Sequence, residues 1–316
     1  MRVRFWGTRG SIAKPGRATL RYGGNTSCVE VRTFDGTLVV LDCGTGAHGL
    51  GHALMAEHDG PIRGYLLVGH THLDHIQGLP FFAPLFIPGN TWDIYAPSGR
   101  YQQLEASLAG LMAYEYSPIA LETLHADVRF HDLREGVFEL GSIRVTAQYL
   151  NHPALTLGYR LEADGVTLVY ATDHEPHALH PLEAALETTP IHPEDQRHVQ
   201  FLQGADLVIH DAQYTLDDFP AKMGWGHTPM EQAVDYVRLA GAKQLALFHH
   251  DPNRHDKAVD RLCKRAKTRA ALDAYAPQVF AAAEGQVIEL SQASNPSPPS
   301  MAPAVSALLP PSSQRP

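Results

Sequence analysis

A short apolar strand that runs directly into a cluster of metal-ligand side chains is the feature that most constrains how this sequence can fold. Tyr65–Gly69 is followed at once by His70-Thr71-His72-Leu73-Asp74-His75. Alternate residues of an extended chain point to the same side, so His70 and His72 can reach one cation together. Asp74 and His75 follow where the chain leaves the strand, and they can face a second cation. A solvated polar loop is the alternative, but it does not explain alternating histidines directly after a buried strand.

Strand-like and helix-like patterns alternate along the chain, which predicts an α/β fold. The expected strands are Arg2–Trp6, Cys28–Thr33, Leu38–Asp42, Tyr65–Gly69, Ile143–Tyr149, Val166–Ala171, Asp206–His210 and Gln244–Phe248. The expected helices are Leu50–His58, Gln102–Leu111, Leu179–Glu187 and Met230–Ala240. The last of these follows a start signal in which Thr228 caps the helix, Pro229 opens it and Glu231 completes a capping box.

The composition narrows the class of protein. The 316 residues are 44% hydrophobic and carry a net charge of -9, which is typical of a globular chain. No apolar run approaches the roughly 18 residues of a membrane helix, and the N-terminus does not resemble a secretory signal, so we expect a cytoplasmic protein with no membrane partner. Three scattered cysteines argue against disulfides and against a thiolate zinc site, whereas 19 histidines favour imidazole ligands.

The C-terminal segment differs from the rest of the chain. Residues 291–316 are dominated by Pro, Ser and Ala without periodicity, which predicts a disordered tail after a single domain of residues 1–290. Within the domain, Gly78–Tyr116 is rich in aromatic residues and prolines. This stretch is either a flap beside the site or ordinary core, and the flap is slightly favoured.

The hexapeptide at residues 70–75 resembles the signature of the metallo-β-lactamase fold hydrolases, and further segments match that family in its order. They are Leu41-Asp42-Cys43-Gly44-Thr45-Gly46, Asn151-His152-Pro153, Tyr170-Ala171-Thr172-Asp173 and Leu247-Phe248-His249-His250. The resemblance covers about residues 1–290. It implies a four-layer αββα sandwich of the metallo-β-lactamase type.

The resemblance also implies a ligand set for two divalent metal ions. His70, His72 and His152 are assigned to one metal, Asp74, His75 and His249 to the other, and Asp173 to the position between them. Imidazole and carboxylate ligands without cysteine suit zinc first, and manganese or iron as alternatives. His174, His210 and His250 adjoin these residues and are expected to support them from behind.

Two more segments resemble the ribonuclease Z and phosphodiesterase branch of this family. Val208-Ile209-His210-Asp211-Ala212 is similar to its His-Glu-Ala-Thr segment, with Asp211 in place of glutamate, and Gly226-His227-Thr228 is similar to its Gly-His-Ser-Thr loop. The resemblance implies that Asp211 orients His227 and that His227 protonates the leaving alkoxide. Asp74, His227 and Asp211 are therefore the expected catalytic residues. Alternatively, His227 merely precedes a helix.

These assignments predict a dinuclear metal-dependent phosphodiesterase in which a metal-bound hydroxide attacks phosphorus. A small phosphodiester such as a cyclic nucleotide is the expected substrate, and its base can stack on Phe81, Phe82, Tyr114 or Tyr116. Only 20 residues separate His152 from Asp173, with no room for a long basic arm, so a ribonuclease Z-like nuclease with a long nucleic acid partner is disfavoured.

The sequence is also compatible with other interpretations. A hydrolase of a lactone, thioester or β-lactam uses the same ligands, and a metal-binding module without turnover keeps the same fold. Gly44-Thr45-Gly46-Ala47-His48-Gly49 fits a dinucleotide fingerprint, but the next strand lacks the acid that the fingerprint needs at its end. These glycines are expected to let the turn pass close beneath the metal loop. A homo-oligomer remains open.

Overall fold

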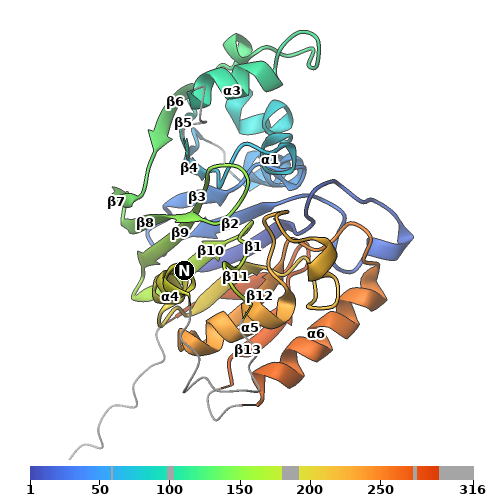
Figure 1. Ribbon diagram of the computed structural model, residues 1–316. Coiled ribbons are helices and arrows are strands. Elements are labelled where there is room, and N and C mark those ends of the chain that lie inside the picture. Colours follow the sequence, from blue (N-terminus) through green and yellow to red (C-terminus); the bar gives the residue numbers. More distant parts are fainter. Residues whose placement is uncertain (58–59, 98–102, 180–191, 273–275, 292–316) are drawn as a thin grey trace, which may run out of the picture.

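Two β-sheets form the centre of the computed structural model, which describes residues 1–57, 60–97, 103–179, 192–272 and 276–291 (Figure 1). Among these residues the first sheet contains β1 (Arg2–Gly7), β2 (Cys28–Arg32), β3 (Leu38–Leu41), β4 (Arg63–Leu67), β5 (Thr91–Pro97), β6 (Asp127–Leu133) and β14 (Val287–Glu289). The second contains β7 (Gly136–Leu140), β8 (Ile143–Leu150), β9 (Thr156–Ala163), β10 (Val166–Ala171), β11 (Leu207–Asp211), β12 (Gln244–Phe248) and β13 (Gln278–Ala281).

Both sheets are mixed, and their parallel halves supply the strand ends that matter for function. The first sheet has the order β14-β1-β2-β3-β4-β5-β6, and β3 to β6 run parallel. The second has the order β13-β12-β11-β10-β9-β8-β7, and β10 to β13 run parallel. Parallel strands place their carboxyl ends along one edge of a sheet, which is where α/β proteins build binding sites.

Helices cover the outer faces of both sheets (Figure 1). They are α1 (Gly46–Glu57), α3 (Leu104–Leu111), α4 (Pro193–Leu202), α5 (Met230–Leu239) and α6 (Asp256–Ala270). The short helix α2 (Leu73–Ile76) instead follows β4. α1 and α3 pack on the first sheet, and α4, α5 and α6 pack on the second. No helix of the described residues is long and apolar enough to span a lipid bilayer.

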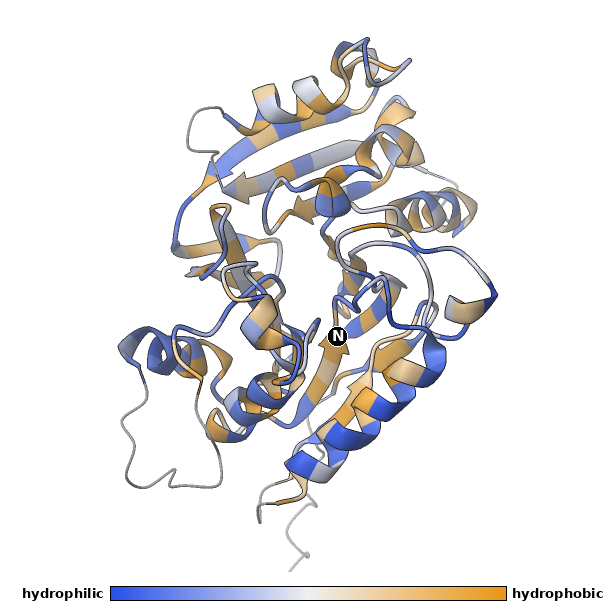
Figure 2. Cartoon of the chain, turned by 45° about the vertical axis from the view of Figure 1, so that its right-hand side comes forward, coloured by the Kyte–Doolittle hydropathy of each residue, from blue (hydrophilic) through white to orange (hydrophobic). Residues whose placement is uncertain are grey.

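Three apolar clusters hold these layers together. The first fills the space between the two sheets, where Phe5, Val31 and Leu41 meet Tyr159 and Phe248. The other two lie between each sheet and its helices. In Figure 2 the hydrophobic residues, coloured orange, gather on the strands and on one side of α6. The succession of helix, sheet, sheet and helix confirms the predicted four-layer αββα sandwich.

The eight predicted strands are confirmed with small shifts at their ends, as are three of the four predicted helices. The fourth, Leu179–Glu187, lies almost wholly outside the described residues, as do residues 292–316 of the predicted tail. The strands β5, β6, β7, β9, β13 and β14 and the helices α2, α4 and α6 were not predicted. In α6 the apolar stripe of Val259, Leu262 and Ala266 is short and interrupted by Lys and Arg.

The predicted flap is largely wrong for the described part of Gly78–Tyr116. Its middle is β5, a strand inside the first sheet, and Phe82 is fully buried in the core against Trp92. Phe82 therefore has no face on which a base can stack. Phe81, Tyr114 and Tyr116 are exposed.

The turn after β3 passes directly beneath the loop after β4, and glycine makes this approach feasible. A Cβ atom on Gly44 would lie 2.3 Å from the carbonyl oxygen of Asp74, and one on Gly78 would lie 2.0 Å from the carbonyl oxygen of Gly44. This confirms the predicted role of the Gly44–Gly46 turn. The close contact fixes the height of the loop that carries residues 70–75.

We predict that Gly78→Ala lowers the free energy of unfolding by about 2 kcal/mol or more, because the added methyl group overlaps backbone and not a flexible side chain. Urea denaturation measures this loss. The matched control is Gly110→Ala in α3, where nothing lies within 4 Å of the new Cβ. The control should stabilise the protein by roughly 0.5 to 1 kcal/mol through helix propensity. Equal effects at both positions would contradict the steric account.

Candidate metal centre

Five short polar stretches converge where strands of the two sheets end. His70 and His72 follow β4, and Asp74 and His75 lie on the short helix α2. The remaining predicted ligands follow strands of the second sheet, namely His152 after β8, Asp173 after β10 and His249 after β12. The structure brings all seven side chains together, although they span 180 positions of the sequence from residue 70 to residue 249.

His70, His72 and His152 form one group. One ring nitrogen of each lies within 4.8 Å of the others, and Nε2 of His152 is 3.3 Å from Nδ1 of His72. The ring centroid of His70 lies 4.4 Å from that of His72 and 4.7 Å from that of His152. His72 is the most exposed of the three, so the group opens to solvent on its side.

Asp74, His75 and His249 form a second group, which is buried. Oδ2 of Asp74 lies 3.3 Å from Nε2 of His75 and 3.1 Å from Nε2 of His249. Asp173 lies between the groups. Its Oδ2 is 3.6 Å from Nε2 of His70 and 3.3 Å from Nε2 of His75, and its Oδ1 is 3.2 Å from Nε2 of His249.

The donor set fits divalent metal ions. Neither ring nitrogen of His70 has a hydrogen-bond partner although the side chain is fully buried, and Nε2 of His75 is also without one. Buried polar atoms normally have a hydrogen-bond partner. These unpartnered nitrogens therefore indicate that they bind a cation. The described cysteines are absent from the cluster, so the available donors are imidazole nitrogen and carboxylate oxygen.

The electrostatics agree with this interpretation. Burial lowers the pKa of His70, His72 and His152, which keeps the imidazoles neutral and able to bind metal. Burial disfavours the charge on Asp173, but the neighbouring His249 and His75 hold its pKa well below the usual range. Burial acts against protonation of His75 too, and the surrounding Asp74, Asp42 and Asp173 nevertheless raise its pKa. A cation can take the place of that proton.

Three of the ligand-type histidines, His75, His152 and His249, are each oriented by a hydrogen bond from the other ring nitrogen. Nδ1 of His75 donates to Oδ2 of Asp42 at 2.6 Å, and Nδ1 of His152 donates to the carbonyl oxygen of Gly226 at 2.9 Å. Nδ1 of His249 donates to Oε1 of Gln213 at 2.8 Å. These partners leave Nε2 of each ring facing the cluster.

Unfavourable backbone conformations concentrate at this site. Among the described non-glycine residues, five have positive φ angles, and four of these belong to the site: Ser11 at 64°, Asp42 at 58°, Asp173 at 61° and His249 at 56°. A left-handed conformation costs roughly 1 kcal/mol or more for such residues. The strand ends therefore turn sharply into the cluster at a cost that the surrounding packing offsets.

Asp211 and His227 lie beside the two groups as a hydrogen-bonded pair. Nδ1 of His227 donates to Oδ2 of Asp211 at 2.9 Å, and the ring of His227 stacks on that of His249 at 5.0 Å between centroids. Burial by itself lowers the pKa of His227, but the charge of Asp211 and this hydrogen bond raise it to about 9. Asp211, His227, Asp173 and His249 each offer a ligand-type atom within 4.8 Å of the others.

The predicted capping box is wrong. α5 begins at Met230 with Pro229 as its N-cap, and no side chain caps it. The Thr228 hydroxyl donates to the carbonyl oxygen of His174, and the Thr228 amide donates to Oδ2 of Asp211 at 3.3 Å. Glu231 accepts from the amide of Leu216 at 3.0 Å. Thr228 therefore stabilises the pair of Asp211 and His227 and not the helix.

Three buried histidines lie behind the cluster. The ring of His198 stacks on that of His174 at 3.9 Å, and its Nε2 lies 2.9 Å from Nε2 of His210, whose Nδ1 donates to the carbonyl oxygen of Asp211 at 2.7 Å. His210 thus contacts the backbone of Asp211, and His174 accepts from the amide of Asn151 at 3.2 Å. His250 donates instead to the carbonyl oxygen of Ala282 at 2.9 Å, so the supporting role of His174, His210 and His250 stays a prediction. His198 was not expected here, because α4 reaches this position only in the folded chain.

Gln213 and Glu175 are further residues that the sequence did not reveal. Gln213 holds His249, and Glu175 accepts hydrogen bonds from the amides of Gly224 and Gly226 at 2.7 to 2.9 Å. Each lies two residues after a predicted site residue, Asp211 or Asp173. Their closeness to predicted site residues in the sequence is the signal by which they could have been found.

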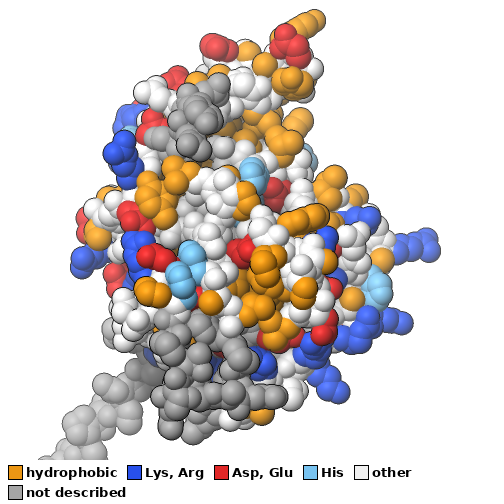
Figure 3. Space-filling model, viewed as in Figure 1, with side chains coloured by type: hydrophobic (Ala, Val, Ile, Leu, Met, Phe, Trp, Pro, Cys, Tyr) orange, Lys and Arg blue, Asp and Glu red, His pale blue; other side chains and the backbone are white. Residues whose placement is uncertain are grey.

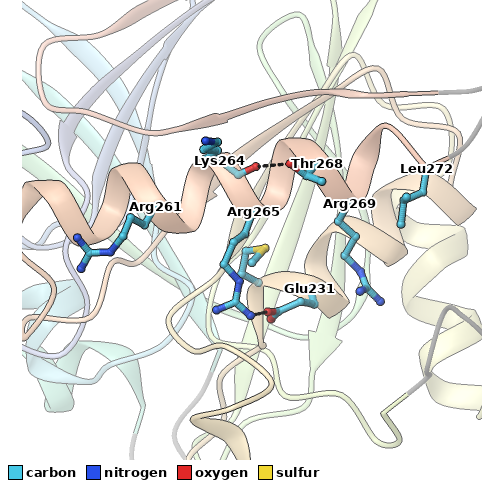
Figure 4. A pocket seen from close by; sticks show the side chains of 8 residues that line it. Glu231, Arg261, Lys264, Arg265, Thr268, Arg269 and Leu272 are labelled. Carbon is cyan, nitrogen blue, oxygen red and sulfur yellow. Dashed lines mark hydrogen bonds and ion pairs between the residues drawn. The ribbon is translucent and has the colours of Figure 1, made fainter.

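A groove between α5 and α6 lies apart from the cluster. Figure 4 shows Arg265 paired with Glu231 at 2.6 Å in this groove, and none of the clustered histidines or aspartates lines it. Basic side chains and Leu272 form most of its wall. The groove therefore offers no metal-ligand set.

Comparisons with known proteins agree with this fold. A family model described as the Beta-lactamase superfamily domain matches residues 37–250. Ribonuclease Z of Haloarcula marismortui is 26% identical over 327 residues, covering 90% of this chain and 95% of that protein. The metallo-beta-lactamase fold protein YhfI from Bacillus subtilis has a TM-score of 0.64 at 20% identity, covering 91% of this chain and 98% of its own. A diphosphatase from the PhnP family has a TM-score of 0.62 at 19% identity, covering 92% and 98%.

We predict that Asp42→Asn weakens binding of divalent metal by about 10- to 100-fold, because the amide no longer accepts a charge-assisted hydrogen bond from His75. Competition with a chromogenic chelator measures the affinity. Asp93→Asn is the matched control, since Asp93 accepts from His131 at 2.8 Å in a similar pair outside the cluster. An equal loss in both variants, or no loss in Asp42→Asn, would contradict the orienting role.

We predict that His198 contributes to acid destabilisation. Burial lowers its pKa well below the ordinary value of 6.5, so below that pH the unfolded chain binds a proton that the folded chain does not. The free energy of unfolding therefore decreases as the pH decreases, by up to about 1.4 kcal/mol per pH unit for one proton. In urea denaturation between pH 7 and 5, His198→Gln should reduce the slope of the free energy of unfolding against pH by the contribution of about one proton. An unchanged slope in His198→Gln would refute the assignment.

Proposed function

The chain belongs to the beta-lactamase superfamily and is a metal-dependent hydrolase of that group, and from this premise we propose that it is a dinuclear phosphodiesterase. The proposed substrate is a small phosphodiester such as a cyclic nucleotide. The hydrogen-bonded pair of Asp211 and His227 beside the metal ligands is the observation that carries the proposal. Departure of an alkoxide from phosphorus requires a proton, and this pair is positioned to supply it.

The proposed ligands divide into two sets. His70, His72 and His152 hold one cation, Asp74, His75 and His249 hold the other, and Asp173 contacts both. Zinc suits these donors, with manganese or iron as alternatives. When bound, two such cations supply Lewis acidity that activates water and stabilises negative charge at phosphorus.

The chain itself supplies the proton donor. In this proposal His227 holds a proton on Nε2 while Nδ1 donates to Asp211, whose carboxylate also accepts from the amides of Gln213 and Thr228 at 2.9 and 3.3 Å. These three contacts fix the carboxylate, so it can orient the imidazole and stabilise the imidazolium. The shorter side chain of aspartate is sufficient, because the His227 loop approaches within 2.9 Å of it.

Two observations support a small substrate. The residues between His152 and Asp173 are taken up by β9 and β10, which Asp164 and Gly165 join in a tight turn, so that connection carries no arm. The net charge of -9 also weakens attraction to a polyanion. The PhnP-family neighbour is described as a diphosphatase, which is in keeping with small phosphate substrates.

A nuclease is the second candidate function. Its support is the name ribonuclease Z of the relative that covers 90% of this chain. Hydrolysis of a lactone, thioester or β-lactam is a third candidate, since the ligand set alone does not distinguish carbon from phosphorus chemistry. The Asp211 and His227 pair favours phosphorus.

The test compares leaving groups in His227→Gln. We predict that the variant retains its metal and hydrolyses a 2′,3′-cyclic nucleotide about 100-fold or more slowly, because its alkoxide leaving group needs a proton. Bis(p-nitrophenyl) phosphate has a leaving group that departs as the anion, so its turnover should fall less than about tenfold. Metal content is counted on the same preparations.

His131→Gln is the matched control, because His131 also pairs with a buried aspartate, Asp93, but lies outside the cluster. It should turn over both substrates at the original rate. Equal losses for both diesters in His227→Gln would remove the proton-donor role. Cleavage of a structured RNA with inert small diesters would favour the nuclease, and turnover of a lactam or lactone alone would overturn the phosphodiesterase.

A further inference from the structure

We propose that the site selects phosphodiesters that carry an aryl or other flat apolar substituent, which binds to an apolar rim formed by Ile12, Leu73, Leu155 and Trp225. This inference rests on the proposed function, since it assigns a substrate class to the same site. The rim residues come from four separate segments, since Leu73 begins α2 and the other three stand in loops. The segments of Leu73, Leu155 and Trp225 also carry His72, His152 and His227, and the Ile12 loop hydrogen-bonds to Asp74.

The rim side chains are apolar and yet largely open to solvent. Their exposed fractions lie between 46% for Leu155 and 63% for Leu73, with Trp225 at 56%. Single exposed apolar residues are ordinary on protein surfaces, whereas a group of them indicates a binding surface. Figure 3 shows hydrophobic side chains gathered over the middle and right of one face, beside histidine and acidic side chains that reach the surface.

The sequence positions of Leu73, Leu155 and Trp225 place their backbones near the cluster. Leu73 lies between His72 and Asp74, and Leu155 is three residues after His152. Trp225 is two residues before His227. Consecutive Cα atoms are about 3.8 Å apart, so each of these three residues is within about 12 Å along the chain of a residue in the centre.

Hydrogen bonds tie the remaining loops to the same centre. The amide of Ser11, next to Ile12, donates to Oδ2 of Asp74 at 2.7 Å. The carbonyl oxygen of Gly226, next to Trp225, accepts from Nδ1 of His152 at 2.9 Å. These contacts hold the backbones next to Ile12 and Trp225 against the metal-ligand groups. In this proposal their exposed side chains border the opening.

The Trp225 ring is held by a cation. Nζ of Lys222 lies 3.9 Å from the centroid of the Trp225 ring and 5.9 Å from that of Tyr214. Tyr214 in turn contacts the ring of His227 at 5.6 Å. An indole fixed in this way offers a flat apolar surface for a ring, and Lys222 adds positive charge that suits an anionic diester.

The rim disfavours a substrate that is polar on every side. A phosphodiester with two small or hydrophilic substituents would leave Ile12, Leu155 and Trp225 in water and gain nothing from them. A phenyl or nucleobase ring removes that apolar surface from water and gains affinity in proportion to the area. The preference should therefore appear in binding, independently of the rate of hydrolysis.

The experiment measures binding of diphenyl phosphate and dimethyl phosphate to the metal-loaded full chain by calorimetry. We expect diphenyl phosphate to bind at least about tenfold more tightly, and Trp225→Ala to remove most of that difference. Ile12→Ala, on another loop, should remove a smaller part of it. Phe34→Ala is the control, because Phe34 is 71% exposed but lies on the turn between β2 and β3.

Equal affinity for the two diesters, or a preference that both Trp225→Ala and Ile12→Ala keep, would overturn the rim as a specificity surface. An equal effect of Phe34→Ala would also overturn it. Failure of the proposed function looks different: diphenyl phosphate would then bind through the rim while no phosphodiester is hydrolysed. Hydrolysis without an aryl preference would leave the function standing and remove this inference alone.

Discussion

The carboxylate of Asp42 is the interaction on which the rest of the site depends. It accepts hydrogen bonds from the amide of Gly69 at 2.7 Å, from Nδ1 of His75 at 2.6 Å and from the hydroxyl of Tyr170 at 2.5 Å. Tyr170 belongs to β10 of the second sheet, whereas Gly69 and His75 lie in the segment that follows β4 of the first sheet. One fully buried group thus joins the two sheets and orients a candidate ligand at the point where they meet.

The site contains unfavourable backbone conformations and buried charged side chains, and the packing around it offsets their free-energy cost. Left-handed backbone at Asp42, Asp173 and His249 turns each strand end abruptly, and Gly44 and Gly78 allow backbones to approach more closely than a Cβ would permit. Histidine and aspartate side chains are then buried together, which is unfavourable unless opposite charges or cations balance them. The three apolar clusters of the sandwich offset this cost.

Sequence predicted the parts of the site that depend on local pattern. Four ligand-type side chains stand within six residues after an apolar strand, namely His70, His72, Asp74 and His75. Both the strand and the cluster could therefore be predicted from the sequence. Gln213, Glu175 and His198 were not, because their roles arise only when distant elements pack together. The capping box failed for a related reason, since the carbonyl oxygen of His174 takes the Thr228 hydroxyl. In Phe82, aromatic character indicated core and not a binding face.

The central claim is that the clustered side chains hold two cations with Asp173 between them. Anomalous X-ray diffraction from crystals of the metal-loaded protein, recorded on both sides of the metal absorption edge, tests this most directly. The account predicts two peaks, one bounded by His70, His72 and His152 and one by Asp74, His75 and His249, each within coordination distance of Asp173. A single peak, a peak outside these residues, or none at all would contradict it.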